Sequence, residues 1–251
     1  MPAHFGDEPL TIEPVAGLIP SPADAAVAVP VAVAAALLIG RLVSWLRRDR
    51  RVAVPYTRKL FHIGIFSIAA GVHALRGAPA VVVYGGVVAL FVLHATWRGD
   101  GHPLFEALAR PGDAPRRALF VIVPLVTTAI GGLAASLLLP RFAAVGYLVA
   151  GWGDAAGEPV GQRWGRHRYR VASLAGVPAT RSIEGSLAVF AVGTVAAVPA
   201  LIAADVSSPL LIAAAFAAGA AGALVEAVSN HGLDNLTVQL AAAGAAAFVA
   251  G

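Results

Sequence analysis

Apolar runs long enough to cross a membrane recur along the whole chain, separated by short polar breaks. A helix needs roughly 17 to 25 such residues to cross about 30 Å of hydrocarbon. Eight runs stand out, some of them short, at residues 25–46, 60–75, 78–97, 118–139, 142–157, 185–203, 209–229 and 236–250. Because 58% of the residues are hydrophobic and only 13% are charged, we expect an all-α, polytopic integral membrane protein with about eight transmembrane helices.

The segment before the first apolar run contains neither Lys nor Arg. A basic segment normally precedes the core of a cleaved export signal, so the first run is expected to remain as an anchor. We expect residues 1–23 to form an extracytoplasmic tail and residues 24–251 to form a single transmembrane helical domain. The chain has no cysteine, which excludes disulfides and thiolate metal sites.

Basic residues gather in three of the loops. Fifteen of the 18 Lys and Arg residues follow the first, third and fifth runs, whereas Arg76 and Arg141 fall in loops of the opposite side. With eight crossings the three basic loops share one face, which the positive-inside rule makes cytoplasmic, with both termini outside. The high isoelectric point therefore indicates membrane topology rather than nucleic-acid binding, and we expect a plasma-membrane protein.

The stretch GWGDAAGEPVGQRWGRHRYR, residues 151–170, is far more polar than the run before it. Proline cannot donate a helical hydrogen bond and disfavours helical backbone in the residue before it. We therefore expect the helix to break between about Ala155 and Pro159. It contains GxGxxxG rather than GxGxxG, and no GxxxxGK[ST] occurs in the chain, so Rossmann and P-loop sites are excluded.

The same stretch holds groups that bind metals and phosphates. Asp154 and Glu158 can hold a divalent cation, and Arg163 and Arg166 can hold phosphate oxygens. Glycines follow at intervals of four, at Gly153, Gly157, Gly161 and Gly165. Such spacing admits a close ligand, but it also fits a ridge of small residues for helix packing.

Three further polar clusters fall on the expected cytoplasmic side. In ATRSIEGSLAVF, Ser182 is a candidate N-cap with Glu184 in the first turn, and Arg181 beside a helix start makes an anion site. Capping alone explains Ser182 and Glu184 about as well as function does. In YTRKLFHIG, Lys59 is the only lysine of the chain; Arg58 and Lys59 can simply end the basic loop, but His62 lies one helical turn on.

In VEAVSNHGLDNLTVQL, Glu226 lies near the end of one run while Asp234 and Asn235 open the last. Asn and Asp are ordinary N-caps, and His231 fits an ordinary loop histidine. A carboxylate near the end of a membrane span is costly unless it faces protein, water or a ligand. Carboxylates, cations and helix starts on one face together indicate a site for a metal-bound polyphosphate, as phosphoryl transfer requires. The acceptor is then expected to be a lipid alcohol that enters from the bilayer.

Four motifs in this order resemble the CTP-dependent lipid-alcohol kinases, which include phytol, farnesol and dolichol kinases and the CTP-dependent diacylglycerol kinases. The motifs are RKLFH (58–62), GDAAGEPVGQRWG (153–165), RSIEGSLA (181–188) and VEAVSNHGLDNLTVQL (225–240). The DNLTV ending looks most like the phytol and farnesol kinase branch. The resemblance covers roughly residue 58 to the carboxyl terminus; each motif alone is weak, and together they are fairly specific.

The resemblance implies a helical membrane enzyme that uses Mg²⁺ to transfer the γ-phosphoryl group of CTP to an isoprenoid alcohol. Phytol, farnesol, geranylgeraniol and polyprenol are the acceptors that it suggests. Two departures from the family pattern concern the nucleotide site. Arg181 stands where many relatives have Lys, and Gly157 with Glu158 replace small or apolar residues. Because Arg is bidentate and stiffer than Lys, the first departure leaves the choice of nucleotide open.

From the motifs and the resemblance together we expect Asp154 and Asp234, with Glu226, to bind Mg²⁺. Asp154 or His62 is expected to accept the proton of the alcohol hydroxyl. Contacts to the nucleotide CTP are expected from Arg58, Lys59, Gly153, Gly157, Gly161, Gly165, Arg166, Arg181, Glu184, Gly185, Ser186 and Asn235. The alternatives are a CTP-dependent diacylglycerol kinase, a phosphatidate cytidylyltransferase-type enzyme and, from another class, a small transporter. A transporter predicts polar residues at mid-span and on both faces, whereas here they collect at one face. The sequence also leaves a homodimer open.

Overall fold

The computed structural model describes residues 17–174, 177–229 and 232–251. Most of the expected amino-terminal tail and His231 therefore lie outside the described residues. The elements are α2 (Pro22–Arg48), α3 (Val54–Arg98), α4 (Pro103–Leu108), η1 (Pro111–Asp113), α5 (Leu119–Leu138), α6 (Ala143–Leu148), η2 (Val149–Gly153), α7 (Asp154–Trp164), β1 (Arg168–Leu174), β2 (Val177–Ser182), α8 (Ile183–Ala203), α9 (Ser208–Val228) and α10 (Asp234–Ala250).

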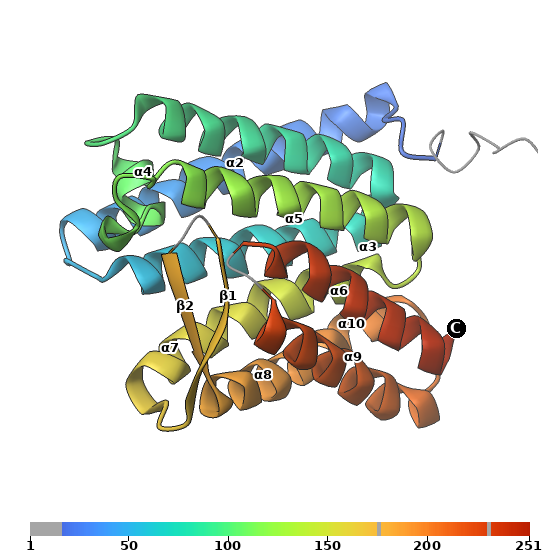
Figure 1. The fold of residues 1–251 in the computed structure, drawn as a ribbon. Helices are drawn as coiled ribbons and strands as arrows, with labels where there is room; N and C mark the ends of the chain where they lie inside the picture. Colours follow the sequence, from blue (N-terminus) through green and yellow to red (C-terminus); the bar gives the residue numbers. More distant parts are fainter. Residues whose placement is uncertain (1–16, 175–176, 230–231) are drawn as a thin grey trace, which may run out of the picture.

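Helix α3 consists of two legs that run in opposite directions and are joined by a turn (Figure 1). The backbone turns back at Gly77, whose φ of 79° is a left-handed value that favours glycine. The hydroxyl of Tyr84 on the second leg donates to the carbonyl of Ile65 on the first, at 3.0 Å. The two legs correspond to the two runs expected at residues 60–75 and 78–97.

Within the described residues, five helices have the length and apolar composition to cross a membrane, namely α2, α3, α5, α8 and α9. The expectation of a predominantly helical integral membrane protein is therefore confirmed. The remaining apolar runs form the segment from α6 to α7 and the 17-residue helix α10. The count of eight crossings stays a prediction.

A two-stranded hairpin, which the sequence did not predict, interrupts the otherwise helical fold. Strands β1 and β2 pair antiparallel, with Arg168 opposite Ser182 and Tyr169 opposite Arg181. Side chains from 168 to 171 alternate between exposed and half-buried, which is the period of a strand with one covered face. The arginines of this segment hide the alternation from a hydropathy pattern, and the sequence alone predicts only a basic loop here.

The expected helix break at Pro159 is also wrong. Helix α7 runs from Asp154 to Trp164 with Pro159 inside it, and the departure from α geometry comes earlier, in the π-helical turn η2. Tertiary packing rather than local propensity decides whether a helix of this length forms. Close packing of α7 against α8, described below, therefore holds it helical through the proline.

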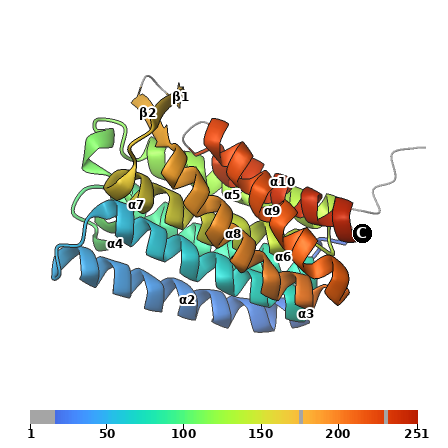
Figure 2. The same cartoon turned by 90° about the horizontal axis from the view of Figure 1, so that it is seen from below.

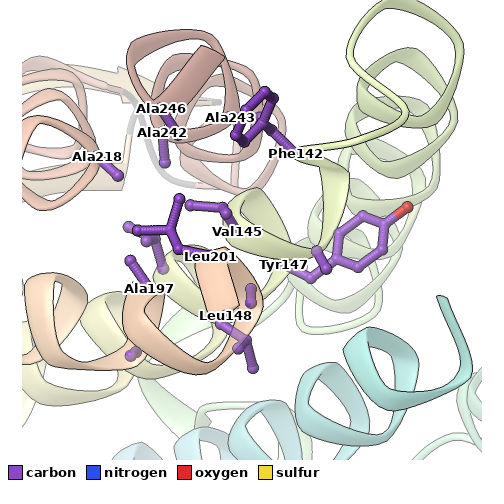
Figure 3. Packing of buried hydrophobic residues seen from close by; sticks show 14 of the residues in the cluster. Phe142, Val145, Tyr147, Leu148, Ala197, Leu201, Ala218, Ala242, Ala243 and Ala246 are labelled. Carbon is purple, nitrogen blue, oxygen red and sulfur yellow. The ribbon is translucent and has the colours of Figure 1, made fainter. Parts of the chain in front are cut away.

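The segment from α6 to α7 passes through the centre of the molecule. Every residue of α6 is buried. Val145 lies between Leu201 of α8 and the alanines Ala242 and Ala246 of α10 (Figure 3). Small side chains on α8, α9 and α10 let these helices approach closely. This packing fixes the position of α7, which follows directly.

Helices α4 and α7 and the β-hairpin gather at one end of the molecule (Figure 2). The loop from α2 to α3 lies at the same end (Figure 1). Arg50 and Arg51 lie in the loop from α2 to α3, Arg110 follows α4, and Arg168, Arg170 and Arg181 belong to the hairpin. At the opposite end, Arg141 donates to the carbonyl of Ala204 at 3.0 Å. The structure therefore places the three basic loops together.

Candidate functional site

Asp154 opens α7 and is almost completely buried. Its Oδ2 lies 2.6 Å from Nζ of Lys59, which comes from the start of α3. Glu158, one turn further along α7, lies 3.5 Å from the same ammonium and 2.6 Å from the guanidinium of Arg110. Burial alone raises the pKa of Glu158, but Lys59 and Arg110 outweigh it and hold that pKa below its ordinary value. The Lys59 ammonium therefore favours the ionised form of both carboxylates.

A second set of ion pairs forms around Arg181 at the end of β2. Its guanidinium pairs with Glu226 near the end of α9 and lies 3.1 Å from Asp234 at the start of α10. The guanidinium also donates to the backbone carbonyl of Ser229 at 3.2 Å. Arg181 thus connects the hairpin to the ends of two helices.

Asp154, Glu226 and Asp234 converge although α7, α9 and α10 bring them from distant parts of the sequence. One carboxylate oxygen from each lies within 4.8 Å of the other two. Carboxylate oxygens are the protein ligands that Mg²⁺ prefers. The donor set therefore fits the hard divalent cation that the sequence analysis assigned to these three residues.

These groups line a polar cavity of about 270 Å³. Its charged lining residues are five cations, Arg58, Lys59, Arg110, Arg168 and Arg181, and four anions, Asp154, Glu158, Glu226 and Asp234. A magnesium–nucleotide complex itself carries both signs of charge, because phosphate oxygens need cations and the metal needs carboxylates. A cavity of mixed charge matches such a ligand better than it matches a simple anion.

The glycines expected at the nucleotide have a packing role. A Cβ on Gly157 would lie 2.6 Å from Cγ2 of Val189 on α8, and one on Gly161 would lie 2.9 Å from Oγ of Ser182. Gly157 and Gly161 also line the polar cavity, but Gly153 and Gly165 do not. The alternative interpretation of the four-residue spacing, a ridge for close helix packing, therefore describes this contact.

We expect Gly157→Ala to lower the free energy of unfolding by about 1–3 kcal/mol, because an added methyl overpacks the contact between α7 and α8. Gly71→Ala is the matched control, since no atom lies within 4 Å of a Cβ at that position. Thermal unfolding in detergent measures both. Equal stability of the two variants would contradict the close packing.

Other predicted residues also have structural contacts. Glu184 accepts hydrogen bonds from the backbone N–H of His167 and lies 2.7 Å from Nδ1 of its ring, so it ties the hairpin to α8. The amide of Asn235 donates to the carbonyl of Pro124 at 3.2 Å and to Oγ1 of Thr128 at 2.9 Å, so it ties α10 to α5. Neither Glu184 nor Asn235 lines the polar cavity.

The start of α8 lies at the cavity wall. Ser182 caps the helix, as predicted, and accepts from the N–H of Gly185 at 3.1 Å. Ser182, Gly185 and Ser186 all line the polar cavity, and the hydroxyl of Ser186 lies 3.1 Å from that of Tyr169 on β1. A helix N-terminus of this kind favours an anion.

Arg166, which was expected at the phosphates, is exposed and lies outside the cavity lining. Arg110 and Arg168, which the sequence analysis did not single out for the site, take part in the lining instead. No motif surrounds Arg110, and Arg168 lines the cavity although it lies on the more exposed face of β1.

Arg58 and His62 lie where the polar cavity meets a second, apolar cavity. Arg58 lines both, and His62 lines the apolar one. Nδ1 of His62 lies 3.1 Å from the carbonyl oxygen of Arg58. Because a carbonyl only accepts, Nδ1 of the neutral ring must donate, which leaves Nε2 as an acceptor.

The chain is similar to a phytol kinase from Synechocystis sp., with 33% identity over 187 residues. The matched region covers 74% of this chain and 76% of the Synechocystis protein. No protein-family model matches the chain, and no solved structure matches it. This identity and coverage show that the chain is related to the Synechocystis protein over most of its length.

Proposed function

Because the chain belongs to the phytol kinase-like family of lipid kinases, we propose that it transfers the γ-phosphoryl group of CTP to a membrane isoprenoid alcohol. The observation that carries the proposal is the convergence of Asp154, Glu226 and Asp234 beside Lys59 and Arg181 in one polar cavity. Phosphoryl transfer depends mainly on positioning and on charge stabilisation. Acidic groups that can hold a metal and basic groups that can hold phosphates supply both the positioning and the charge stabilisation.

Asp154, Glu226 and Asp234 would hold Mg²⁺. When bound, Mg²⁺ neutralises and orients the phosphate oxygens. Lys59 and Arg181, which neutralise these carboxylates in the structure, supply the cationic groups nearest to a phosphate at this point. Arg58, Arg110 and Arg168 extend the positive lining, and the start of α8 adds its N-terminal dipole.

His62 is the better candidate for the base, because Asp154 already accepts from Lys59 at 2.6 Å. The proton of the alcohol hydroxyl moves to Nε2 of His62 while the alcohol oxygen bonds to the γ-phosphorus. The bond from that phosphorus to the bridging oxygen breaks, and CDP leaves. The lipid alcohol would approach from the apolar cavity, which His62 lines, and CTP would bind in the polar cavity, which the carboxylates line.

We place the polar cavity at the cytoplasmic face of the plasma membrane, where CTP is available. The support is the gathering of the basic loops at the end that holds α4, α7 and the hairpin (Figure 2), together with the positive-inside rule. Both termini would then lie outside, as expected from eight crossings. Cysteine-accessibility labelling from intact cells, at Ser207 on one end and Gly99 on the other, checks this orientation.

The decisive test of the reaction type uses CTP labelled at either the α- or the γ-phosphate, with purified protein, Mg²⁺ and phytol. We expect the γ-label to enter the lipid and the α-label to remain in CDP. Label from the α-phosphate in the lipid, with release of pyrophosphate, would identify cytidylyl transfer instead. Replacement of CTP by ATP, GTP or UTP, and of phytol by farnesol, geranylgeraniol, polyprenol or diacylglycerol, determines the donor and the acceptor.

A further inference from the structure

We propose that the apolar cavity binds the hydrocarbon chain of the acceptor alcohol and that its deep end limits the length of chain accepted. This inference rests on the proposed function, which supplies an alcohol as the substrate. The cavity has a volume of about 390 Å³ and lies between the two legs of α3 and helix α5. It is a separate compartment from the polar cavity, and the two have Arg58 in common.

The lining of this cavity suits hydrocarbon. Aliphatic and aromatic side chains form most of it, including Phe61, Ile65 and Phe66 of the first leg of α3. Apart from Arg58 and His62 at the head of the cavity, the polar side chains of the lining are bonded within the protein. Tyr84 donates to the carbonyl of Ile65 at 3.0 Å, and the hydroxyls of Ser136 and Tyr147 lie 2.6 Å apart. An apolar chain therefore enters without leaving these groups unpaired.

Arg58 and His62 determine which way the alcohol lies. Arg58 belongs to both cavities, so the head of the apolar cavity opens where the phosphates are proposed to bind. The Nε2 atom of His62 is left to accept a proton at this junction. A hydroxyl placed here would meet the base and the γ-phosphate together, with its chain pointing away along α3 and α5.

The cavity is long. Its lining on α5 extends from Phe120 to Ser136, and 16 steps of the helix correspond to about 24 Å. On the first leg of α3 it extends from Arg58 to Ala69, about 16 Å along the axis. Half of the hydrocarbon thickness is about 15 Å. A cavity of this length fits a long chain better than a short alcohol.

The second leg of α3 provides a route from the bilayer. Gly85 and Gly86 line the cavity and are exposed, and no atom lies within 4 Å of a Cβ built on either. Leu133 on α5 also lines the cavity and is 40% exposed. A lipid can therefore enter sideways, without passing through water.

Gly86→Leu tests occupation of the cavity, because the added side chain has room and projects from a lining residue. Gly71→Leu is the matched control on the same helix, at an exposed glycine with equal room that does not line the cavity. The first measurement is equilibrium binding of tritiated geranylgeraniol to purified protein in micelles without nucleotide. We expect at least about a tenfold weaker Kd for Gly86→Leu and an unchanged Kd for Gly71→Leu.

Ala69→Leu tests the limit on chain length, because Ala69 lies at the deep end of the lining. We expect kcat/KM for geranylgeraniol to fall about tenfold while that for the shorter geraniol stays within twofold. A fall of equal size for both alcohols, in protein with normal thermal unfolding, would overturn the length limit. An equal Kd for geranylgeraniol in the wild type and in Gly86→Leu would overturn the binding site itself.

A diazirine-bearing geranylgeraniol separates this inference from the proposed function. Crosslinks to peptides of α3 and α5 in the absence of nucleotide support the binding site even if no phosphate is transferred. Transfer that proceeds normally in Gly86→Leu, with crosslinks elsewhere, supports the kinase and overturns the binding site. If Gly86→Leu unfolds, Gly85→Leu at the neighbouring lining residue takes its place.

Discussion

Asp154→Asn and Asp234→Asn are each expected to lower the rate of phosphoryl transfer by about a thousandfold. Metal ions contribute several kcal/mol of charge stabilisation to such reactions, and about 4 kcal/mol corresponds to this factor. Asn keeps the shape of Asp but removes the negative charge that a divalent cation requires. Initial rates of purified protein at saturating CTP, phytol and Mg²⁺ measure the effect.

Glu106→Gln is the matched control for this loss. Glu106 on α4 is paired with Arg117 at 2.8 Å, and it does not line the polar cavity. Its pKa is held below the ordinary value chiefly by the hydrogen bond from Arg117. We expect near-normal activity in this variant. Near-normal activity in either Asp variant, with normal thermal unfolding, would remove the proposed metal site.

Lys59→Met is expected to lower the free energy of unfolding by about 3–5 kcal/mol, the usual cost of leaving a buried charge without its partner. Lys59 is 5% exposed and contacts both Asp154 and Glu158. Activity is expected to fall at least about a hundredfold, because a proposed phosphate ligand is lost as well. Arg48→Met is the control and should change little, since its pair with Asp49 lies on the surface.

The double variant Lys59→Met/Asp154→Asn separates the two effects. Removal of both charges of the pair should restore much of the lost stability, because the carboxylate left without its cation is removed too. Activity should stay absent. Strictly additive losses of stability in the two single variants and the double variant would show that Lys59 and Asp154 do not interact as the 2.6 Å contact indicates.

Hydropathy predicted the helical membrane fold because apolar length is a local property of the sequence. It also located the two legs of α3 and their turn near Gly77. The hairpin and the continuity of α7 depend on tertiary contacts. Pro159 stays helical because α7 packs against α8, and this contact is not visible from the proline and its neighbours.

For the site, the sequence singled out Asp154, Glu226 and Asp234, and the structure brings their carboxylates together. Their roles stay predictions. Such residues stand out in a sequence because a carboxylate near a membrane span is energetically costly unless it faces protein, water or a ligand. Arg110 and Arg168 were missed because arginine in a basic loop is ordinary, and only the folded chain places these two at the cavity.

Transfer of label from γ-labelled CTP to phytol, by purified protein in lipid micelles with Mg²⁺, tests the central claim most directly. We predict a lipid-extractable phosphate monoester whose formation requires Mg²⁺ and is lost in Asp154→Asn. Absence of label in the lipid with CTP, ATP, GTP and UTP alike, from protein that unfolds cooperatively and binds nucleotide, would contradict the assignment of a lipid-alcohol kinase to this cavity.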